Sequence, residues 1–272
     1  MRQKILMVNG DDFGLNRQMN HGILDAARRG ILTQATLLLG QPGTTRAILM
    51  ARRHNLPLGL HLNITIGSPS AALDKIPSLV NNGQFYNVAY CTKPDWERFV
   101  APISPQEVTI ELAAQVSLFT KLVGKPPTHM DSHEVLSGHP KLLPAYLSLA
   151  QKTRIPMRRP VWYREPHVRN RANTFFKPLP KTILPKTVPT TDRVIFMSDV
   201  RLGGVESLVR LLKSLPAGRT ALVTHPAHKN LPIKKEIAMR NVDHELLIHP
   251  EVQKTIQKEG IRLSTFEREF VA

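Results

Sequence analysis

The sequence predicts an α/β fold, a parallel (β/α) barrel formed by one domain over residues 1–272. Short apolar runs suited to buried strands alternate with segments of helical periodicity along the chain, and this alternation is typical of parallel sheets with helical crossovers. The chain of 272 residues is long enough for about seven such units in one domain, which favours a barrel over an open sheet. Both nucleotide-binding fingerprints, GxGxxG after the first strand and GxxxxGK[ST], are absent.

The first sixty residues are expected to form three strands and two helices. KILMVN and LGLHLNI have the composition of buried parallel strands, and Gly30 follows the first helical segment as a stop signal. We predict strands over 4–9, 33–39 and 58–64, and helices over 16–29 and 44–54.

A long insertion separates this part from the next helix. Residues 67–105 are rich in Pro, Gly, Asn and Ser, and a long loop in a compact domain is usually a lid or a binding loop. Ser104 then begins a helix, with Pro at the first helical position and Glu107 three residues after the cap. This helix is expected to run to Val123 and to end at Gly124.

The second half continues the alternation after a basic, Pro-rich excursion over 152–190. We predict strands over 127–132, 193–197, 220–224 and 261–264, and helices over 140–152, 204–214 and 250–259.

The chain is strongly basic, with 37 Lys and Arg against 21 Asp and Glu and a formal charge of +16. Its densest basic stretch lies in the excursion, where interspersed prolines exclude a basic helix. The stretch, which includes Arg158, either contacts an anionic substrate or lipid headgroup or is a solvated surface. Aromatic residues make up only 6% and offer no stacking platform, so no specific nucleic-acid partner is expected.

The single cysteine, Cys91, cannot form an internal disulfide or a thiolate zinc cage, so a metal here must rest on His and carboxylate ligands. We interpret Cys91 as structural. A chain with a single cysteine is compatible with a cytoplasmic location. No apolar run reaches the roughly 18 residues that a transmembrane helix needs. The sequence is also compatible with a homodimer.

Polar groups follow four of the predicted strands, and the carboxyl ends of barrel strands converge on one mouth. Each group alone could have a structural role, because an Asp pair can cap a turn and a buried histidine can be structural. The hypothesis of a functional site therefore depends on all the groups meeting at one end of the barrel. The groups are Asp11 with Asp12, His61, His133 with His129 and Asp131, and His225.

These carboxylate and imidazole side chains suit a catalytic metal site. One of the adjacent carboxylates, Asp11 or Asp12, could bind a cation while the other accepts a proton. A carboxylate and two imidazoles leave positions open on zinc or a similar ion. His225 either protonates a leaving amine or stabilises its loop. His129 and Asp131, two residues apart on a strand, share a face and could orient the ligands.

Four motifs in order, NGDDFGLN, GLHLNIT, PTHMDSHEVL and LVTHPA, resemble the YdjC-like carbohydrate deacetylases, which include chitooligosaccharide and hopanoid-associated deacetylases. The closing segment with Arg240 and Glu245 is also similar to that of the family. The resemblance implies an irregular seven-stranded barrel of the polysaccharide-deacetylase type. It also implies a substrate that is an N-acetylated amino sugar, oligosaccharide or glycolipid.

The resemblance also implies roles for individual residues. Asp11 would be the general base, and Asp12, His61 and His133 would hold one divalent ion, Zn²⁺ or Mg²⁺. His225 would act as an acid or contact the substrate, as the late histidine of the family does. Two imidazole ligands favour zinc or another transition ion, because magnesium prefers oxygen ligands. Arg240 is expected to contact the substrate or support the ligands.

The chain departs from the family where further histidines usually follow the metal ligand. Glu134, Val135 and Ser137 stand there, so we expect the metal ligand to be kept, the groove beside it to be altered, and the substrate to differ more than the chemistry. The rival hypotheses are a metal-dependent phosphodiesterase or glycoside hydrolase on a similar barrel and, from another class, a basic nucleic-acid-binding protein.

Overall fold

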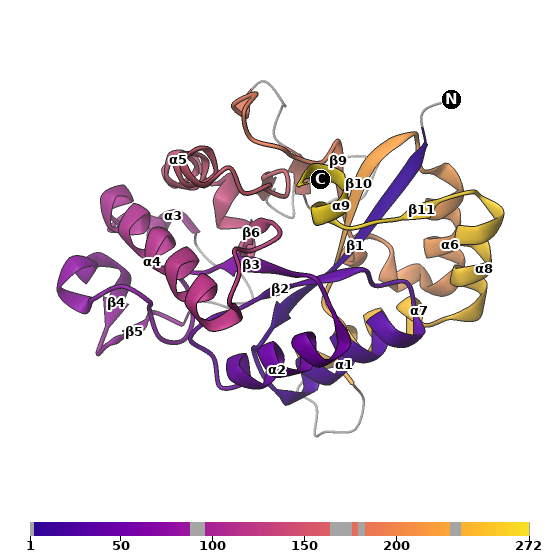
Figure 1. Cartoon of the computed structure of the whole chain (residues 1–272), viewed down its shortest axis with the longest axis horizontal. Helices are drawn as coiled ribbons and strands as arrows, with labels where there is room; N and C mark the ends of the chain where they lie inside the picture. Colours follow the sequence, from indigo (N-terminus) through magenta and orange to yellow (C-terminus); the bar gives the residue numbers. More distant parts are fainter. Residues whose placement is uncertain (1–2, 88–95, 164–175, 179–182, 229–234, 272) are drawn as a thin grey trace.

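The computed structural model describes residues 3–87, 96–163, 176–178, 183–228 and 235–271. Its centre is a parallel sheet with helices around the outside (Figure 1). Six strands follow one another in the order β6-β3-β2-β1-β10-β9, and β11 pairs with β1. The strands are β1 (Lys4–Phe13), β2 (Gln34–Leu37), β3 (Leu58–Leu62), β6 (Met130–Ser132), β9 (Arg193–Phe196), β10 (Gly218–Thr224) and β11 (Arg262–Leu263).

An irregular seam joins the two edges of this sheet. Met157 forms parallel bridges with Met130 of β6 and with Thr190, which lies just before β9. The Arg158 N–H donates to the Met130 carbonyl at 2.8 Å, and the Met157 N–H donates to the Pro189 carbonyl at 2.9 Å. The seven-stranded parallel sheet therefore curves into an incomplete, irregular barrel, as the sequence predicted.

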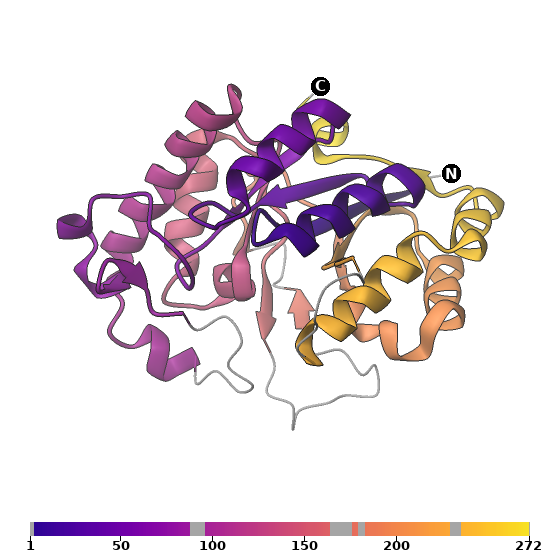
Figure 2. The same cartoon turned by 90° about the horizontal axis from the view of Figure 1, so that it is seen from below.

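Amphipathic helices cover the outer face of the sheet. Helix α1 packs against α2 on one side and α7 on the other, and α4 packs against α5 (Figures 1 and 2). The α-helices are α1 (Arg17–Arg29), α2 (Thr44–His54), α3 (Trp96–Val100), α4 (Pro105–Val123), α5 (Leu143–Thr153), α6 (Gly204–Ser214), α7 (Lys235–Leu247), α8 (Pro250–Lys258) and α9 (Phe266–Phe270). Short 3₁₀ segments cover Leu73–Lys75, Pro77–Leu79, His133–Gly138, Met197–Asp199 and Arg201–Gly203.

Two apolar clusters lie on opposite faces of the sheet. On β10, Leu222 belongs to the large cluster that the helices cover, whereas Ala221 and Val223 belong to a small cluster with Val194 and Phe196. Successive side chains of a strand point to opposite faces, so the small cluster lines the inside of the barrel.

The insertion over 67–105 packs onto the barrel in the part that is described. It contains a short hairpin of β4 (Val80–Asn81) and β5 (Gln84–Phe85), and Ile76, Leu79 and Phe85 are buried against the large cluster. Residues 88–95, with Cys91, lie outside the described residues.

The basic excursion over 152–190 contains an antiparallel hairpin of β7 (Val161–Tyr163) and β8 (Phe176–Pro178). Three of its six arginines, Arg164, Arg169 and Arg171, lie outside the described residues. For Arg158 the interpretation as a surface cation is wrong. Its side chain is 5% exposed and lies inside the barrel, because the seam directs this residue inward.

Each predicted strand and helix is present in the structure, with shifts at its ends. Strand β1 continues through Asp11 and Asp12, which the sequence placed in a loop. Helices α3, α7 and α9 and the two hairpins, β4–β5 and β7–β8, were not predicted. In the part of the chain that is described, no helix combines the length and apolar composition needed to cross a bilayer.

Candidate active site

The candidate residues meet at the carboxyl ends of neighbouring strands. Asp11 and Asp12 end β1, His61 lies near the end of β3, and Asp131 lies on β6 directly beside His61 in the register. His133 follows β6 immediately. Parallel strands of one sheet therefore bring together five side chains that are up to 122 residues apart in the sequence (Asp11 to His133), as the convergence hypothesis required.

A break in β1 turns both aspartates toward the same site. The pairing of β1 with β2 shifts register between Gly10 and Phe13, and Asp12 has a φ of 63°. In a regular strand neighbouring side chains point to opposite faces, and a bulge re-aims one of them. As a result Asp11 and Asp12 are both buried and both face His61.

Asp12 and the two histidines form a tight group of three. Asp12 Oδ1 lies 3.3 Å from His61 Nε2 and 3.6 Å from His133 Nε2, and the two imidazole rings are perpendicular with centroids 5.5 Å apart. The other oxygen, Asp12 Oδ2, accepts a hydrogen bond from Arg240 at 2.7 Å. Asp12 Oδ1 is buried without a hydrogen-bond partner among the described residues, and the two imidazole nitrogens are the polar atoms that it faces.

The His61 imidazole is oriented by a carboxylate at its Nδ1 atom. Its Nδ1 lies 2.6 Å from Asp131 Oδ1, which leaves Nε2 directed toward Asp12. Burial opposes the charged imidazole, but the nearby carboxylates of Asp131, Asp12 and Asp11 outweigh it and raise the pKa of His61 to about 10. Without another cation nearby, His61 is therefore protonated at neutral pH.

Asp11 is paired with a buried arginine. The Arg158 guanidinium donates to both oxygens of Asp11, at 2.7 and 2.8 Å, and also lies 2.8 Å from Asp131 Oδ2. Burial alone would raise the pKa of Asp11, but Arg158, with His61, holds it well below its usual range. Asp11 is therefore ionised over the whole physiological range of pH.

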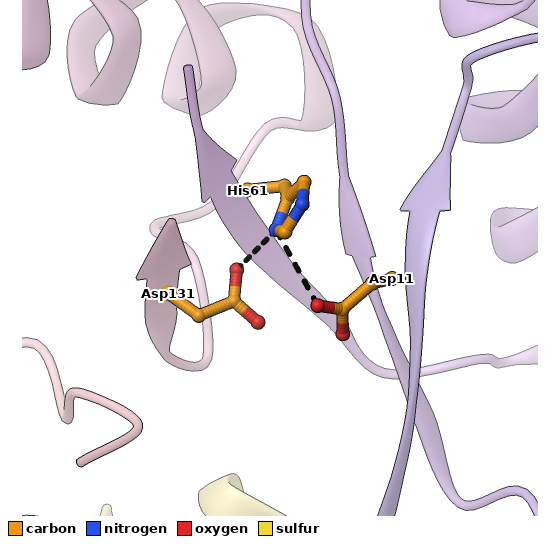
Figure 3. Close-up of side chains that lie close together, drawn as sticks. All are labelled: Asp11, His61 and Asp131. Atoms are coloured by element: carbon orange, nitrogen blue, oxygen red, sulfur yellow. Dashed lines mark hydrogen bonds and ion pairs between the residues drawn. The ribbon is translucent and has the colours of Figure 1, made fainter. Parts of the chain in front are cut away.

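Asp11, His61 and Asp131 form a second group that could hold a cation (Figure 3). Each offers one ligand atom, and these atoms lie within 4.8 Å of one another. In this group, however, His61 Nδ1 already binds Asp131, and Arg158 already neutralises both carboxylates. A cation there would have to displace the guanidinium or lie beside its charge, which like-charge repulsion opposes.

The donor set around Asp12 fits a divalent metal better. A buried carboxylate oxygen without a hydrogen bond is costly unless a proton or a cation satisfies it. One oxygen and two imidazole nitrogens suit zinc or a similar ion and leave positions open. Burial lowers the pKa of His133 to about 3, so this imidazole is neutral and can offer a lone pair.

His225 and Arg240 approach the group from the other side of β1. The His225 backbone N–H donates to Asp243 Oδ2 of α7 at 2.9 Å, which fixes the segment after β10. Burial lowers the pKa of His225 to about 4, despite the opposing charges of Asp12 and Asp11. His225 is therefore neutral at physiological pH. Arg240, also on α7, directly contacts Asp12.

His129 does not reach the group of three but acts on Asp11 through Asn9. His129 Nε2 lies 3.0 Å from Asn9 Oδ1, and Asn9 Nδ2 donates to Asp11 Oδ1 at 2.7 Å. The imidazole also stacks on Phe266 with a centroid separation of 4.2 Å. Burial lowers the pKa of His129 to about 4, so it supports Asp11 as a neutral donor.

The backbone after His133 is unusual where the sequence departs from the YdjC-like pattern. Glu134 and Val135 have φ of 55° and 53°, a region that costs a β-branched residue energy. Glu134 Oε1 lies 3.9 Å from His133 Nε2. The Ser132 hydroxyl donates a hydrogen bond to the Ser137 hydroxyl at 2.8 Å. The segment that replaces the histidines is thus a strained turn at the edge of the group.

Sequence reasoning missed Arg158 and Asn9 as members of the site. Arg158 follows no strand and lies in a segment whose charge density suggests a surface. Asn9 sits inside an apolar strand, where a single polar residue is a weak signal. The one usable hint was that Asn9 and Asp11 are two residues apart and share a strand face.

The comparisons agree with this geometry. The chain matches the family described as YdjC-like protein over residues 5–258. A carbohydrate deacetylase from Geobacillus stearothermophilus is 30% identical, with 97% of each chain covered. The crystal structure of an Enterococcus faecalis V583 protein, to which cellobiose-phosphate cleavage has been ascribed, is 28% identical with a TM-score of 0.79 and 98% of each chain covered.

A more distant structure extends the similarity of fold. A family 4 carbohydrate esterase from Streptomyces lividans is 11% identical, with a TM-score of 0.50 over 97% of this chain and 94% of that one. The incomplete barrel is therefore of the deacetylase type that the sequence predicted. Because the family match spans nearly the whole chain, from the first strand to α8, this chain belongs to the YdjC-like family.

Proposed function

We propose that this chain is a metal-dependent hydrolase that removes the acetyl group from an N-acetylated amino sugar, oligosaccharide or glycolipid. One observation carries the proposal: Asp12 Oδ1 is buried without a hydrogen bond and faces two imidazole nitrogens, from His61 and His133. The carbohydrate deacetylase relative supports the substrate class, because the match covers 97% of both chains.

Asp12, His61 and His133 would hold the metal in the proposed site. When bound, a divalent cation there would lower the pKa of water and polarise an amide carbonyl. Two imidazoles and one carboxylate favour zinc or another transition ion over magnesium. Arg240 holds the second oxygen of Asp12, so only Oδ1 is directed at the cation.

Asp11 is proposed as the base that takes the proton of the attacking water. It is ionised, it lies 4.0 Å from His61 Nδ1 on the side away from Asp12, and it has no place in the proposed ligand set. Arg158 keeps the carboxylate charged and fixes its direction. A positioned carboxylate of this kind contributes to catalysis by proton transfer.

His225 is proposed to assist the departure of the amine. A neutral imidazole must first gain a proton before it can act as an acid, and the nearby carboxylates of Asp11 and Asp12 favour that step. The interpretation of His225 as a structural residue remains the alternative, because its backbone already anchors the loop on Asp243.

The geometry argues against glycoside hydrolysis at this site. Such enzymes use two carboxyl groups on opposite sides of the bond, roughly 5–9.5 Å apart. Here Asp11 and Asp12 are neighbours in the chain and each is bound to an arginine. A cytoplasmic location, a homodimer and the absence of a specific nucleic-acid partner stay predictions from the sequence.

The proposal is tested with acetate release from N-acetylated chitooligosaccharides and glycolipids, together with metal analysis. Asp11→Asn is expected to keep the metal and lose nearly all turnover, because it removes the base and leaves Asp12 intact. His61→Ala and His133→Ala are each expected to lose the metal.

Asp74→Asn and His54→Ala serve as matched controls, because both residues are exposed and outside the site. Wild-type turnover in Asp11→Asn would reject the base, and full metal occupancy in His61→Ala or His133→Ala would reject the ligand set.

A further inference from the structure

We propose that Thr65 is a positioning residue that fixes the tautomer and direction of His133 through its hydroxyl group. The inference rests on the proposed metal site, because it explains why His133 presents Nε2 and not Nδ1 to that site. Thr65 follows β3 in the chain, and its Oγ1 lies 2.6 Å from His133 Nδ1.

The argument begins with Asn63, whose side-chain amide has a single allowed orientation. Asn63 Nδ2 donates to the Ile66 carbonyl at 2.7 Å, while Oδ1 accepts from the backbone N–H groups of Thr65 and Ile66, at 2.9 and 3.2 Å. Turning the amide over would place its NH₂ against two donors and its oxygen against an acceptor. Asn63 Oδ1 is therefore an acceptor at a known place.

The Thr65 hydroxyl group therefore donates its only proton to Asn63 Oδ1. Thr65 Oγ1 lies 2.9 Å from Asn63 Oδ1, and two oxygens at this distance need a proton between them. The hydroxyl has one proton and gives it to Asn63, so toward His133 it can only accept. His133 must then carry its proton on Nδ1, which leaves the lone pair on Nε2, 3.6 Å from Asp12 Oδ1.

Helix α4 holds this arrangement in place. Gln115 Oε1 accepts from the Asn63 backbone N–H at 3.0 Å, and Gln115 Nε2 donates to the Asn63 carbonyl. One turn earlier, Glu111 accepts from Gln115 and from the N–H groups of Ser70 and Ala71. Both side chains are buried, so the turn that carries Thr65 is fastened at both ends to one helix.

The two histidines are therefore held by different partners. His61 Nδ1 faces the carboxylate of Asp131, whereas His133 Nδ1 faces a neutral hydroxyl. A carboxylate partner strengthens the basicity of a ligand, and a hydroxyl orients it without adding charge. Thr65 thus orients the His133 imidazole without adding a charge to the site.

The test compares Thr65→Val, which removes the hydroxyl at nearly constant volume, with Thr65→Ser, which keeps it. Thr220→Val is the matched control, because Thr220 is buried on β10 and its hydroxyl has no hydrogen-bond partner among the described residues. Zinc affinity is measured by competition with a chromophoric chelator. Thr65→Val is expected to bind zinc about 10- to 100-fold more weakly, while Thr65→Ser and Thr220→Val stay close to wild type.

The tautomer is read separately in the metal-free protein from the ¹⁵N resonances of His133, assigned with His133→Gln. Protonated Nδ1 in the wild type, lost as the dominant form in Thr65→Val, supports the inference. Protonated Nε2 in the wild type, or unchanged zinc affinity in Thr65→Val, would overturn it. A wild-type chain that binds neither zinc nor another divalent transition ion would reject the proposed metal site, and the ¹⁵N spectrum would still decide the role of Thr65.

Discussion

At the scale of single residues, the site separates two adjacent carboxylates by giving each its own arginine. Arg240 binds Asp12 and Arg158 binds Asp11, so neighbouring charges that would repel each other are both stable in a buried place. The positive φ of Asp12 completes the separation by re-aiming its side chain. Two residues next to each other in the sequence can therefore have different roles.

Arg158 gives the first prediction at this scale. Arg158→Met should lower the free energy of unfolding by about 3–5 kcal/mol, because it leaves Asp11 and Asp131 as buried charges without their partner. Arg158→Lys keeps a charge but loses the two-pronged contact with Asp11, so we expect a folded protein with normal metal content and at least about tenfold lower kcat. Urea unfolding, metal analysis and acetate release measure these effects. A wild-type kcat in Arg158→Lys would show that the geometry of the Asp11 contact is unimportant.

At the scale of elements, the site depends on how α1 packs against the segment after β10. A Cβ built on Gly22 of α1 would lie 2.5 Å from the Pro226 carbonyl oxygen and 2.6 Å from Ala227 Cα. The helix can approach this backbone only because residue 22 has no side chain. The same segment begins with His225, so the packing of α1 sets the position of that histidine.

Gly22→Ala should therefore disturb both stability and activity. Overpacking of this kind costs about 1–3 kcal/mol, although Ala favours the helix itself by nearly 1 kcal/mol. We expect a lower Tm, together with a fall in kcat at unchanged metal content, because the His225 segment moves and Asp12 does not. Arg28→Ala, an exposed change on the same helix, is the control. A Gly22→Ala variant with raised Tm and full kcat would contradict the predicted contact.

Elements with local signals were predictable and those without were not. Ser104 and Gly124 cap α4 as expected, with the Ser104 side chain accepting from the Glu107 N–H and Gly124 left-handed at φ 86°. Helix α7 escaped prediction because Arg240 and Asp243 lie on its inward side. These charged residues serve the site, and they break the apolar periodicity by which a helix is recognised.

At the scale of the whole molecule, the proposed cation would tie three strands of the barrel together. Its ligands come from β1, from β3 and from the residue after β6, so a metal bound only by the folded chain stabilises it by mass action. Chelation should lower Tm. The effect should depend on pH through His61, whose pKa is about 10 in the metal-free chain.

The sign of this dependence follows from the proton on His61 Nε2. The metal-free fold is stabilised by protonated His61 below its unfolded pKa of about 6.5, and this contribution disappears as the pH rises through about 10. Metal binding must displace the proton, so affinity should rise about tenfold per pH unit up to about pH 10. Calorimetric titrations with zinc in buffers of different ionisation enthalpy measure the released proton. A binding constant that is flat between about pH 6 and pH 8 would contradict the prediction.

The parallel barrel and the convergence of polar residues at one end of it could be predicted, whereas the contacts between the side chains of the site could not. Polar residues after apolar runs place Asp12, His61 and His133 at one end of a parallel barrel, because the topology is regular there. Arg158 could not be placed, since it enters through the seam, where single bridges replace strands. Its position depends on how the barrel closes, which no local pattern encodes.

The seam has a consequence for the motions of the molecule. Met157 contributes only single bridges to Met130 and Thr190, whereas β1 pairs with β10 over seven residues. Regions with few backbone hydrogen bonds open locally at lower free energy than the centre of a sheet. Transient opening of the seam would move Arg158 away from Asp11. The lifetime of the Arg158–Asp11 ion pair is therefore set by the free energy of opening the seam, which amide hydrogen exchange of residues near Met157 would report.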